Sequence, residues 1–216
     1  PPDLPDDLAG LGGWQSTITT RNGDVWLGST QVLAWRHQSS WRVFSTTNQL
    51  GPEGVTAFAE AADGRIWCAT PGKVWEFDGR NWLDLRGGFT HINGLCSART
   101  GTLWVATDAG VYRYAQDAWI ANGVEDGLPA PMVRSLAEDA AGHITATTPP
   151  GAAVFRPAAD TEPPRTFIFT TGAGENNYPE GATVTLSFRG RDKWKLTAAS
   201  RLLFSYRLDE REWSRF

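Results

Sequence analysis

A short motif, Gly-x-x-Trp, recurs along the 216-residue chain at a nearly constant spacing, and no other feature limits the fold so strongly. It begins at Gly23, Gly64 and Gly101, and a copy without its Trp begins at Gly142, so successive copies start 41, 37 and 41 residues apart. A period near 40 residues is typical of stacked supersecondary units that bury their apolar faces against one another. The chain is therefore predicted to be an array of similar units.

Two further positions of the repeat recur at a fixed distance from the Gly-x-x-Trp motif. A second Trp follows the first after 15 residues in three units, at Trp41, Trp82 and Trp119. A large apolar residue lies nine positions before each glycine, at Trp14, Val55, Ile92 and Val133. The shorter middle period comes from the connection after the second Trp of the second unit, and connections between elements tolerate changes of length.

Each unit is predicted to contain four short strands. In the second unit these strands cover residues 55–60, 65–70, 73–77 and 81–85, separated by Asp-Gly, Pro-Gly and Asp-Gly turns. Asp-Gly favours a tight hairpin, and the β-branched and aromatic content argues against helix. Since no stretch has a sustained 3.6-residue apolar period, we expect little or no helix. Four antiparallel strands in about 40 residues are typical of one blade of a β-propeller.

The pattern changes near Pro149. The fourth unit has a third strand at 153–155 but no fourth strand with its Trp, and a proline-rich stretch follows. Beyond it, apolar and polar residues alternate at 183–188 and 202–208, and an earlier strand is predicted at 165–170. These segments are interpreted as half-buried antiparallel strands of a sandwich. About 50 residues are too few for a complete sandwich of roughly 100 residues. We therefore expect a second domain that is truncated.

Composition and charge exclude several classes of partner. The net charge is −4 with no basic cluster, which disfavours binding of nucleic acid. There is no apolar run of 18 residues, so no membrane span is expected within this chain. The chain starts at Pro1 without a signal-like segment, and we interpret it as a piece of a longer polypeptide. The two cysteines, Cys68 and Cys96, are expected to be buried free thiols, although neighbouring blades could bring them together.

No set of residues predicts catalysis, a metal or a cofactor. The three histidines His37, His91 and His143 belong to different units and lack metal-ligand spacing. No phosphate-binding loop or hydrolase nucleophile elbow occurs. The turn carboxylates Asp63 and Asp78 are expected to form local hydrogen bonds. The repeated tryptophans are interpreted as core residues in preference to a platform on which a sugar would stack. The charged stretch 189–194 is interpreted as a solvated loop.

The ligand-binding residues are left unassigned, although a propeller suggests where a ligand would bind. One face of several blades converges into a funnel, a natural pocket for a small or oligomeric ligand. The connections at 48–54, 86–91 and 122–132 would line one rim of that funnel.

The repeat resembles the two-component regulator propeller repeat of bacterial sensors. The resemblance rests on Asp-Gly-Arg-Ile-Trp-Cys-Ala-Thr at 63–70, Gly-Val-Tyr-Arg-Tyr at 110–114, and Asp-Gly-Leu-Pro at 126–129 leading into 133–139. The tail, with residues 160–164, 204–209 and Trp213-Ser214, resembles the Ig-like (Y_Y_Y type) domain that follows such propellers. This sequence departs from the family pattern in two ways. It has Thr145 where the family has Trp, and it has fewer blades than the family usually has. We expect a degenerate last blade and further upstream blades in the same polypeptide.

The resemblance implies an extracytoplasmic sensory region of a membrane-anchored two-component signalling protein, located in the periplasm or outside the cell. Its propeller would bind a small-molecule or oligosaccharide ligand, and its Ig-like domain would relay the signal to an output domain. A homodimer would form through the full-length protein. Any kinase activity would lie outside this chain, which is itself not expected to be an enzyme.

The predicted fold class is therefore all-β, a partial β-propeller followed by a truncated Ig-like β-sandwich. The predicted divisions are an inter-blade connection or end of a missing blade at 1–13, blades at 14–54, 55–91 and 92–132, a partial blade at 133–156, a linker at 157–164, and the start of the Ig-like domain at 165–216. Because the first and last blades cannot meet, an open arc with exposed apolar edges is expected.

Two other function classes remain open. One is a protein-interaction scaffold. The other is a propeller enzyme, of glycosidase, lyase or quinone type. The turn at 63–67 partly matches the Asp-box of sialidases, and residues 99–104 partly match the repeat of quinone-binding propellers, but neither supplies a catalytic set.

Overall fold

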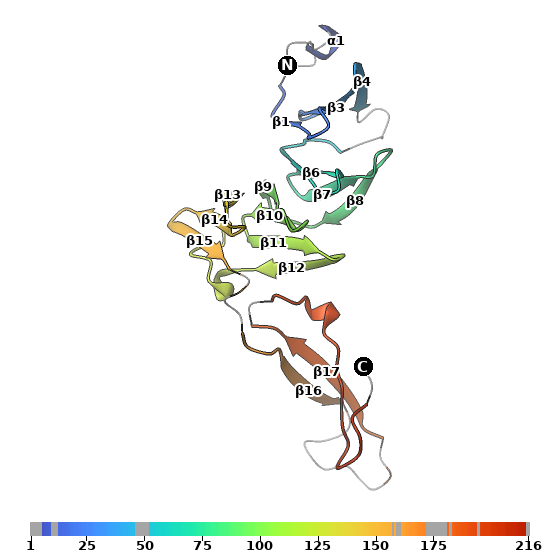
Figure 1. Ribbon diagram of the computed structural model, residues 1–216, viewed down its shortest axis with the longest axis vertical. Helices are drawn as coiled ribbons and strands as arrows, with labels where there is room; N and C mark the ends of the chain where they lie inside the picture. The colour runs from blue at the N-terminus through green and yellow to red at the C-terminus, as the bar shows by residue number, and fades with distance from the viewer. Residues whose placement is uncertain are drawn as a thin grey trace. The chain divides into compact units, whose positions relative to one another are not determined.

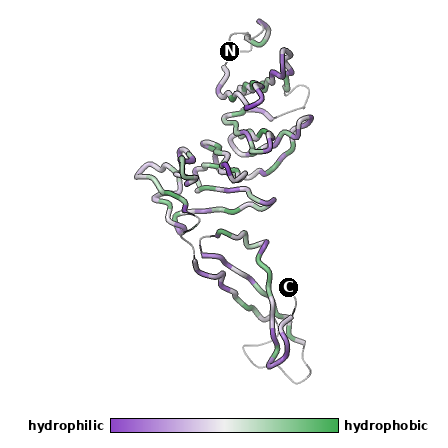
Figure 2. The backbone as a smooth tube through the Cα atoms, viewed as in Figure 1, coloured by the Kyte–Doolittle hydropathy of each residue, from purple (hydrophilic) through white to green (hydrophobic). Residues whose placement is uncertain are grey.

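The structure is a computed structural model that describes residues 6–9, 13–45, 52–156, 158, 161–171, 181, 183–193 and 195–214. It divides into two compact units, residues 1–156 and 157–216. In both units apolar and polar segments alternate along the strands (Figure 2). Within the described ranges, no helix is long and apolar enough to cross a membrane.

The first unit is built from four successive antiparallel sheets (Figure 1). The first blade contains β1 (Ser16–Thr19), β2 (Val25–Gly28), β3 (Val32–His37) and β4 (Ser40–Ser45). The second contains β5 (Ala57–Glu60), β6 (Ile66–Thr70), β7 (Lys73–Phe77) and β8 (Trp82–Gly87). The third contains β9 (Ile92–Ser97), β10 (Leu103–Thr107), β11 (Gly110–Ala115) and β12 (Ala118–Asn122). The fourth contains β13 (Ser135–Glu138), β14 (Ile144–Thr148) and β15 (Gly151–Phe155). The predicted all-β fold with a partial propeller is thus confirmed, and its last sheet has three strands.

The glycine of the repeat turns each first hairpin. Gly23, Gly64, Gly101 and Gly142 have φ angles of 87°, 89°, 84° and 86°, in the left-handed region. A side chain would be strained in this conformation, which glycine adopts without a steric penalty. The same turn therefore joins the first two strands of every blade.

The tryptophan of the repeat fills the seam between its own blade and the next one. Trp26, Trp67 and Trp104 are 1%, 1% and 5% exposed. Trp26 packs against Phe58 and Phe77 of the second blade. Trp67 and Trp104 belong to the clusters that join the second blade to the third and the third to the fourth. We call these layers the first, second and third seams, and their tryptophans are core residues, as predicted.

An arginine–glutamate pair ties the first and third seams but not the second. The Arg21 backbone N–H and Nε donate to the Glu60 carboxylate at 3.0 and 3.1 Å. Arg99 of the third blade repeats the contact with Glu138 of the fourth, its backbone N–H donating at 3.0 Å. At the matching positions of the second seam lie Ala62 and Ser97. The second seam therefore lacks a contact that the other two have.

A short helix, α1 (Asp6–Ala9), lies in the stretch predicted to be an inter-blade connection or the end of a missing blade. Its Leu8 is 2% exposed and packs in a cluster with Val25, Leu27 and Ala34 of the first blade. The expectation of an exposed apolar edge is wrong at this face, because Leu8 and the partly buried Trp14 cover it.

The second unit contains one two-stranded antiparallel sheet, β16 (Arg165–Thr171) paired with β17 (Thr185–Arg191), and a short 3-10 helix, η4 (Ala199–Arg201). The strand predicted at 202–208 is absent from the described part of this unit. Instead, Phe204 and Tyr206 stack on Phe188, each with ring centroids 6.0 Å apart. The alternation therefore reflected side-chain packing against β17 without a hydrogen-bonded ladder.

Two other expectations for this unit also need correction. Residues 189–191 of the predicted solvated loop belong to β17, and the Asp192 side chain is buried and accepts a hydrogen bond from the Thr197 backbone N–H at 2.8 Å. Trp194 lies outside the described residues. The strand β16 was expected to be half-buried, but its Ile168 is 61% exposed. The Ig-like character of this unit stays a prediction.

Candidate functional site

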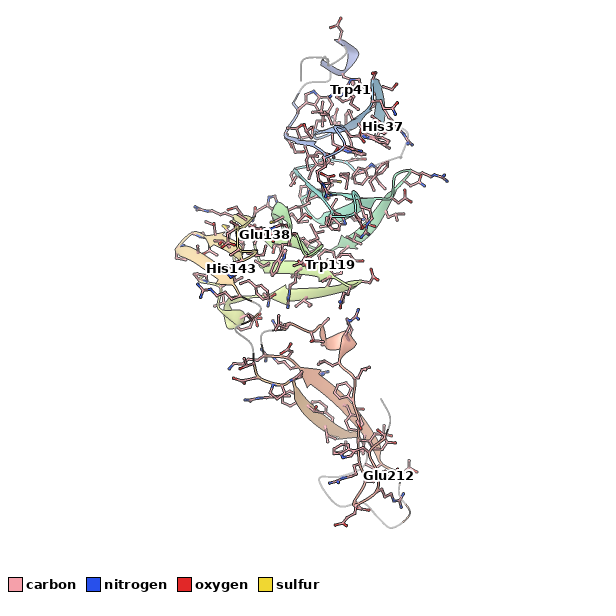
Figure 3. The ribbon with its side chains drawn as sticks, viewed as in Figure 1. His37, Trp41, Trp119, Glu138, His143 and Glu212 are labelled. Carbon is pink, nitrogen blue, oxygen red and sulfur yellow. The ribbon has the colours of Figure 1, made fainter. Side chains whose placement is uncertain are left out.

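The structure does not bring the three histidines together. His37 Nδ1 lies 2.9 Å from Asp24 Oδ1 in the first blade, and His143 Nδ1 lies 3.1 Å from Asp139 Oδ2 in the fourth (Figure 3). His91 is exposed in the connection before β9. Among the residues that the structure describes, no group of three or more His, Cys, Asp or Glu side chains could hold a metal ion.

The turn carboxylates form local hydrogen bonds, as expected. Asp63 accepts from the Arg65 backbone N–H at 3.1 Å, and Asp78 accepts from the backbone N–H groups of Arg80 and Asn81 at 2.7 and 2.8 Å. The hydrogen bonds from Asn81 and Arg80 lower the pKa of the Asp78 carboxyl. These aspartates stabilise turns and have no further partner that suggests chemistry.

Of the three predicted rim segments, 86–91 contains the most distinctive group of side chains. Residues 48–51 of the first rim segment lie outside the described residues, and the third segment contains a short 3-10 helix, η2 (Val124–Asp126). In the second, the Arg86 guanidinium lies 5.3 Å from the ring centroid of Phe89, 5.0 Å from that of Tyr112 and 5.3 Å from that of Trp119. We call these four residues the Arg86 cluster.

The cluster bridges two blades. Arg86 is the penultimate residue of β8, the outermost strand of the second blade, whereas Tyr112 and Trp119 belong to β11 and β12 of the third. Phe89 is buried in the connection between the blades, and its ring meets Tyr112 edge-on at 5.0 Å. A guanidinium over aromatic faces is held by cation–π attraction, which is stronger where water is partly excluded. The cluster therefore fixes the direction of the Arg86 side chain.

A β-bulge directs Arg86 to this side of the sheet. Trp75 of β7 pairs with Asp84, but the preceding Val74 pairs with Arg86, so Leu85 is an extra residue on β8. A bulge interrupts the strict alternation of side chains and can re-aim one of them. Leu85 packs into the second seam, and Arg86 faces the same seam instead of the opposite one. The corresponding strands β4 and β12 pair without a shift of register.

The second seam is also more open and more polar than the first. In the first seam Phe77 and Trp82 are buried beneath Trp35 and Phe44 of the first blade. The repeat places Tyr114 and Trp119 at the matching positions of the second seam, and both are half-buried. Glu76 and Leu85 replace Trp35 and Phe44. Smaller or charged side chains on the second blade thus leave the aromatic rings of the third partly uncovered.

The charged groups beside the cluster have partners of their own. Glu76 accepts hydrogen bonds from Trp67 Nε1 at 2.7 Å and from Arg65 Nη1 at 2.8 Å. The Tyr114 hydroxyl donates to Asp117 at 2.9 Å. Burial and this hydrogen bond raise the pKa of Tyr114 to about 12, so the phenol stays protonated near neutrality. By contrast, within the described ranges no residue forms a hydrogen bond or ion pair with the Arg86 guanidinium.

The cysteines are both free thiols, Cys68 buried and Cys96 half-buried. Burial raises the pKa of the Cys68 thiol well above its usual value. Burial, and next the Glu138 carboxylate, also raise the pKa of Cys96. Cys68 has the burial that the sequence predicted, and Cys96 is more accessible than expected.

These environments predict different reactivities. A thiolate is the reacting species, so a raised pKa and burial both slow alkylation. In the native protein at pH 8, we expect iodoacetamide to modify Cys96 slowly and Cys68 more slowly still, whereas both react rapidly in urea. Mass spectrometry of tryptic peptides over time measures the two rates. Native labelling of Cys68 at the rate seen in urea would contradict the buried position.

Solved structures similar to this one include extracellular domains assigned to two-component and one-component systems. An extracellular domain assigned to a hybrid two-component system of B. thetaiotaomicron aligns with a TM-score of 0.57 at 23% identity, covering 66% of this chain and 21% of the other. A second such domain, assigned to a one-component system of the same organism, aligns at 0.55 and 17% identity, covering 65% and 21%. PorZ, a surface component of the type-IX secretion system of Porphyromonas gingivalis, aligns at 0.51 and 18% identity, covering 67% and 26%.

This chain spans about a fifth of the length of the two signalling domains. No protein-family model and no curated protein sequence matches it. At these identities the likeness concerns the fold, and it bears on about two thirds of the chain. The structure and these neighbours together show an all-β chain with successive propeller blades, as the spacing of the Gly-x-x-Trp repeat predicts.

Proposed function

We propose that this chain is part of the extracytoplasmic sensory region of a membrane-anchored bacterial two-component protein, in the periplasm or outside the cell. The observation that supports this most is the run of propeller blades whose fold matches the extracellular domains of such systems. In this proposal the propeller binds a small molecule or an oligosaccharide, and the second unit relays the bound state toward an output domain.

The blade architecture is suited to this task. Each seam joins two blades through side chains from both, so a ligand that contacts two blades changes the stability of the layer between them. A propeller enzyme is an alternative that the sequence leaves open, so turnover of oligosaccharides is tested as well.

A protein-interaction scaffold is the second candidate, and one observation favours it. Phe167 and Phe169 on one face of β16 and Ile168 on the other are all exposed, and exposed apolar side chains on both faces of a strand mark surfaces that another protein segment covers. In a sensor the rest of the polypeptide would cover them, whereas in a scaffold a separate protein would.

The location of the native full-length polypeptide tests the proposal. We expect proteinase K added to spheroplasts to degrade the region of this chain while a cytoplasmic marker stays intact. Protection equal to that of the marker would contradict an extracytoplasmic position. Turnover of oligosaccharides by the purified protein would favour an enzyme, and a stable stoichiometric protein partner without any ligand response would favour a scaffold.

A further inference from the structure

We propose that the second seam binds an anionic ligand, with Arg86 as the residue that binds the anion. The inference deepens the proposed sensory function, because it names a site and a ligand chemistry for it. The ligand would present a carboxylate or sulfate group next to a flat apolar face. The oxyanion would meet the guanidinium, and the apolar face would lie against the half-buried rings of Tyr112 and Trp119.

The first reason is the state of the guanidinium. Arginine presents donors in a planar fork that matches a carboxylate or sulfate in a bidentate way. Three rings hold the Arg86 group in place, so little conformational freedom remains to be lost on binding. Its donors have no partner among the described residues, and the side chain is only half-buried. A fixed cation with free donors is suited to binding an anion.

The second reason is that the protein's own carboxylates around the cluster are engaged elsewhere. Glu76 on β7 is bonded to Arg65, Asp84 on β8 to Lys73 Nζ at 2.7 Å, and Asp117 in the turn before β12 to the Tyr114 hydroxyl. The first two carboxylates are paired with cations and the third accepts from a hydroxyl, and none of the three forms an ion pair with Arg86. The positive charge is therefore available to an external ligand.

The third reason comes from comparing the repeats. The positions that match Arg86 are Ser45 in the first blade and Gly123 in the third, so neither of these blades has a cation there. The bulge that turns Arg86 toward the third blade occurs in β8 and not in β4 or β12. Bulges are found preferentially beside functional sites, where they re-aim a side chain. A feature of one blade that its sister blades lack is not needed to build a blade.

The fourth reason is that this seam lacks the arginine–glutamate tie of its neighbours. Ala62 and Ser97 stand where the first and third seams have Arg and Glu. A ligand between Arg86 of the second blade and Trp119 of the third would add a contact across that layer. Binding would therefore raise the melting temperature of the first unit.

The experiment measures binding to the whole 216-residue chain by isothermal titration calorimetry and thermal shift. The probes are sodium sulfate, digalacturonate and the neutral disaccharide galactobiose, which separate a free anion from an anion carried on a sugar. We expect digalacturonate, sulfate or both to bind saturably and galactobiose to bind at least ~10-fold more weakly, because the charge-assisted hydrogen bonds are missing.

The variants separate the charge from the packing. Arg86→Met keeps an unbranched apolar stem over the rings and removes the charge, so its affinity for the anionic probes should fall about 10- to 100-fold. Arg86→Lys keeps the charge without the planar fork and should lose less. The matched control is Arg42→Ala, because Arg42 also stacks on an aromatic ring, that of Phe44 at 4.7 Å, but lies in the first blade. Its affinity should stay within about 2-fold of the wild type.

Several results would overturn the inference. One is an affinity of Arg86→Met equal to that of the wild type, and another is an equal loss in Arg42→Ala. The absence of saturable binding of every anionic probe would also overturn it. None of these results contradicts the sensory function, which the spheroplast experiment tests independently. If the protein is protected from proteinase K in spheroplasts but still binds an anionic probe through Arg86, the sensory function is rejected and the binding site is supported.

Discussion

Replacing Trp26 with Ala is expected to lower the free energy of unfolding of the first unit by about 3–5 kcal/mol. Its ring is 1% exposed and stacks on Trp35 with centroids 5.1 Å apart. It also meets Phe77 at 4.9 Å and Trp82 at 5.3 Å, both from the next blade. The change leaves a cavity in a layer that joins two blades, so the lost burial and the lost contacts add.

Urea denaturation followed by far-UV circular dichroism measures this effect without relying on tryptophan fluorescence. Leu83→Ala is the matched control, since Leu83 is 49% exposed on β8 and should change the free energy by no more than ~0.5 kcal/mol. Trp26→Phe should fall between the two, because it keeps an aromatic ring. A loss from Trp26→Ala as small as that from Leu83→Ala would show that the first seam is not a packed core.

Replacing Gly110 with Ala is expected to destabilise the third blade by about 3–5 kcal/mol, from two effects that act together. Gly110 begins β11 with a φ of 120°, which side chains rarely adopt. A Cβ there would also lie 2.5 Å from the Asn122 backbone oxygen on β12. Relieving the contact requires β11 and β12 to separate where they pair, so the outer strand of the blade would be displaced.

Gly94→Ala provides the comparison for Gly110→Ala within the same blade. Gly94 lies in β9, and a Cβ there would have no heavy atom within 4 Å. Alanine restricts the unfolded chain more than glycine does, so this change should be neutral or stabilise by up to about 1 kcal/mol. Thermal unfolding of both variants measures the difference. Equal melting temperatures would refute the strain and the close contact assigned to Gly110.

Much of the first unit follows from the repeat columns. The recurring glycine predicts the hairpins, and at all four positions it has the left-handed backbone that suits a tight turn. The tryptophan column predicts the seams, because a large apolar side chain at a fixed place in each blade must be buried against the next one. Thr145 ends the column, and its blade is the one with three strands. The period is informative because the same residue type recurs at the same position of several units, which indicates that it has the same packing role in each.

The second unit was less predictable for the opposite reason, since it has no repeats. The two-residue alternation at 202–208 indicated a strand, but alternation reports which side chains face a neighbour and not whether the backbone is hydrogen-bonded. Phe204 packs on Phe188 without forming a ladder. The helix around Leu8 was missed because a four-residue segment is too short to show a helical period.

The blades, their order and the burial of Trp26, Trp67 and Trp104 could be derived from the amino-acid sequence, because hairpin turns and apolar spacing are local properties. The candidate site, by contrast, depends on contacts between strands that are far apart in the sequence. Arg86 would face the first seam in a regular strand, and it reaches Tyr112 and Trp119 because one extra residue shifts the pairing of β8 with β7. A bulge depends on how two strands pair, so it cannot be predicted from the spacing of residues along one strand.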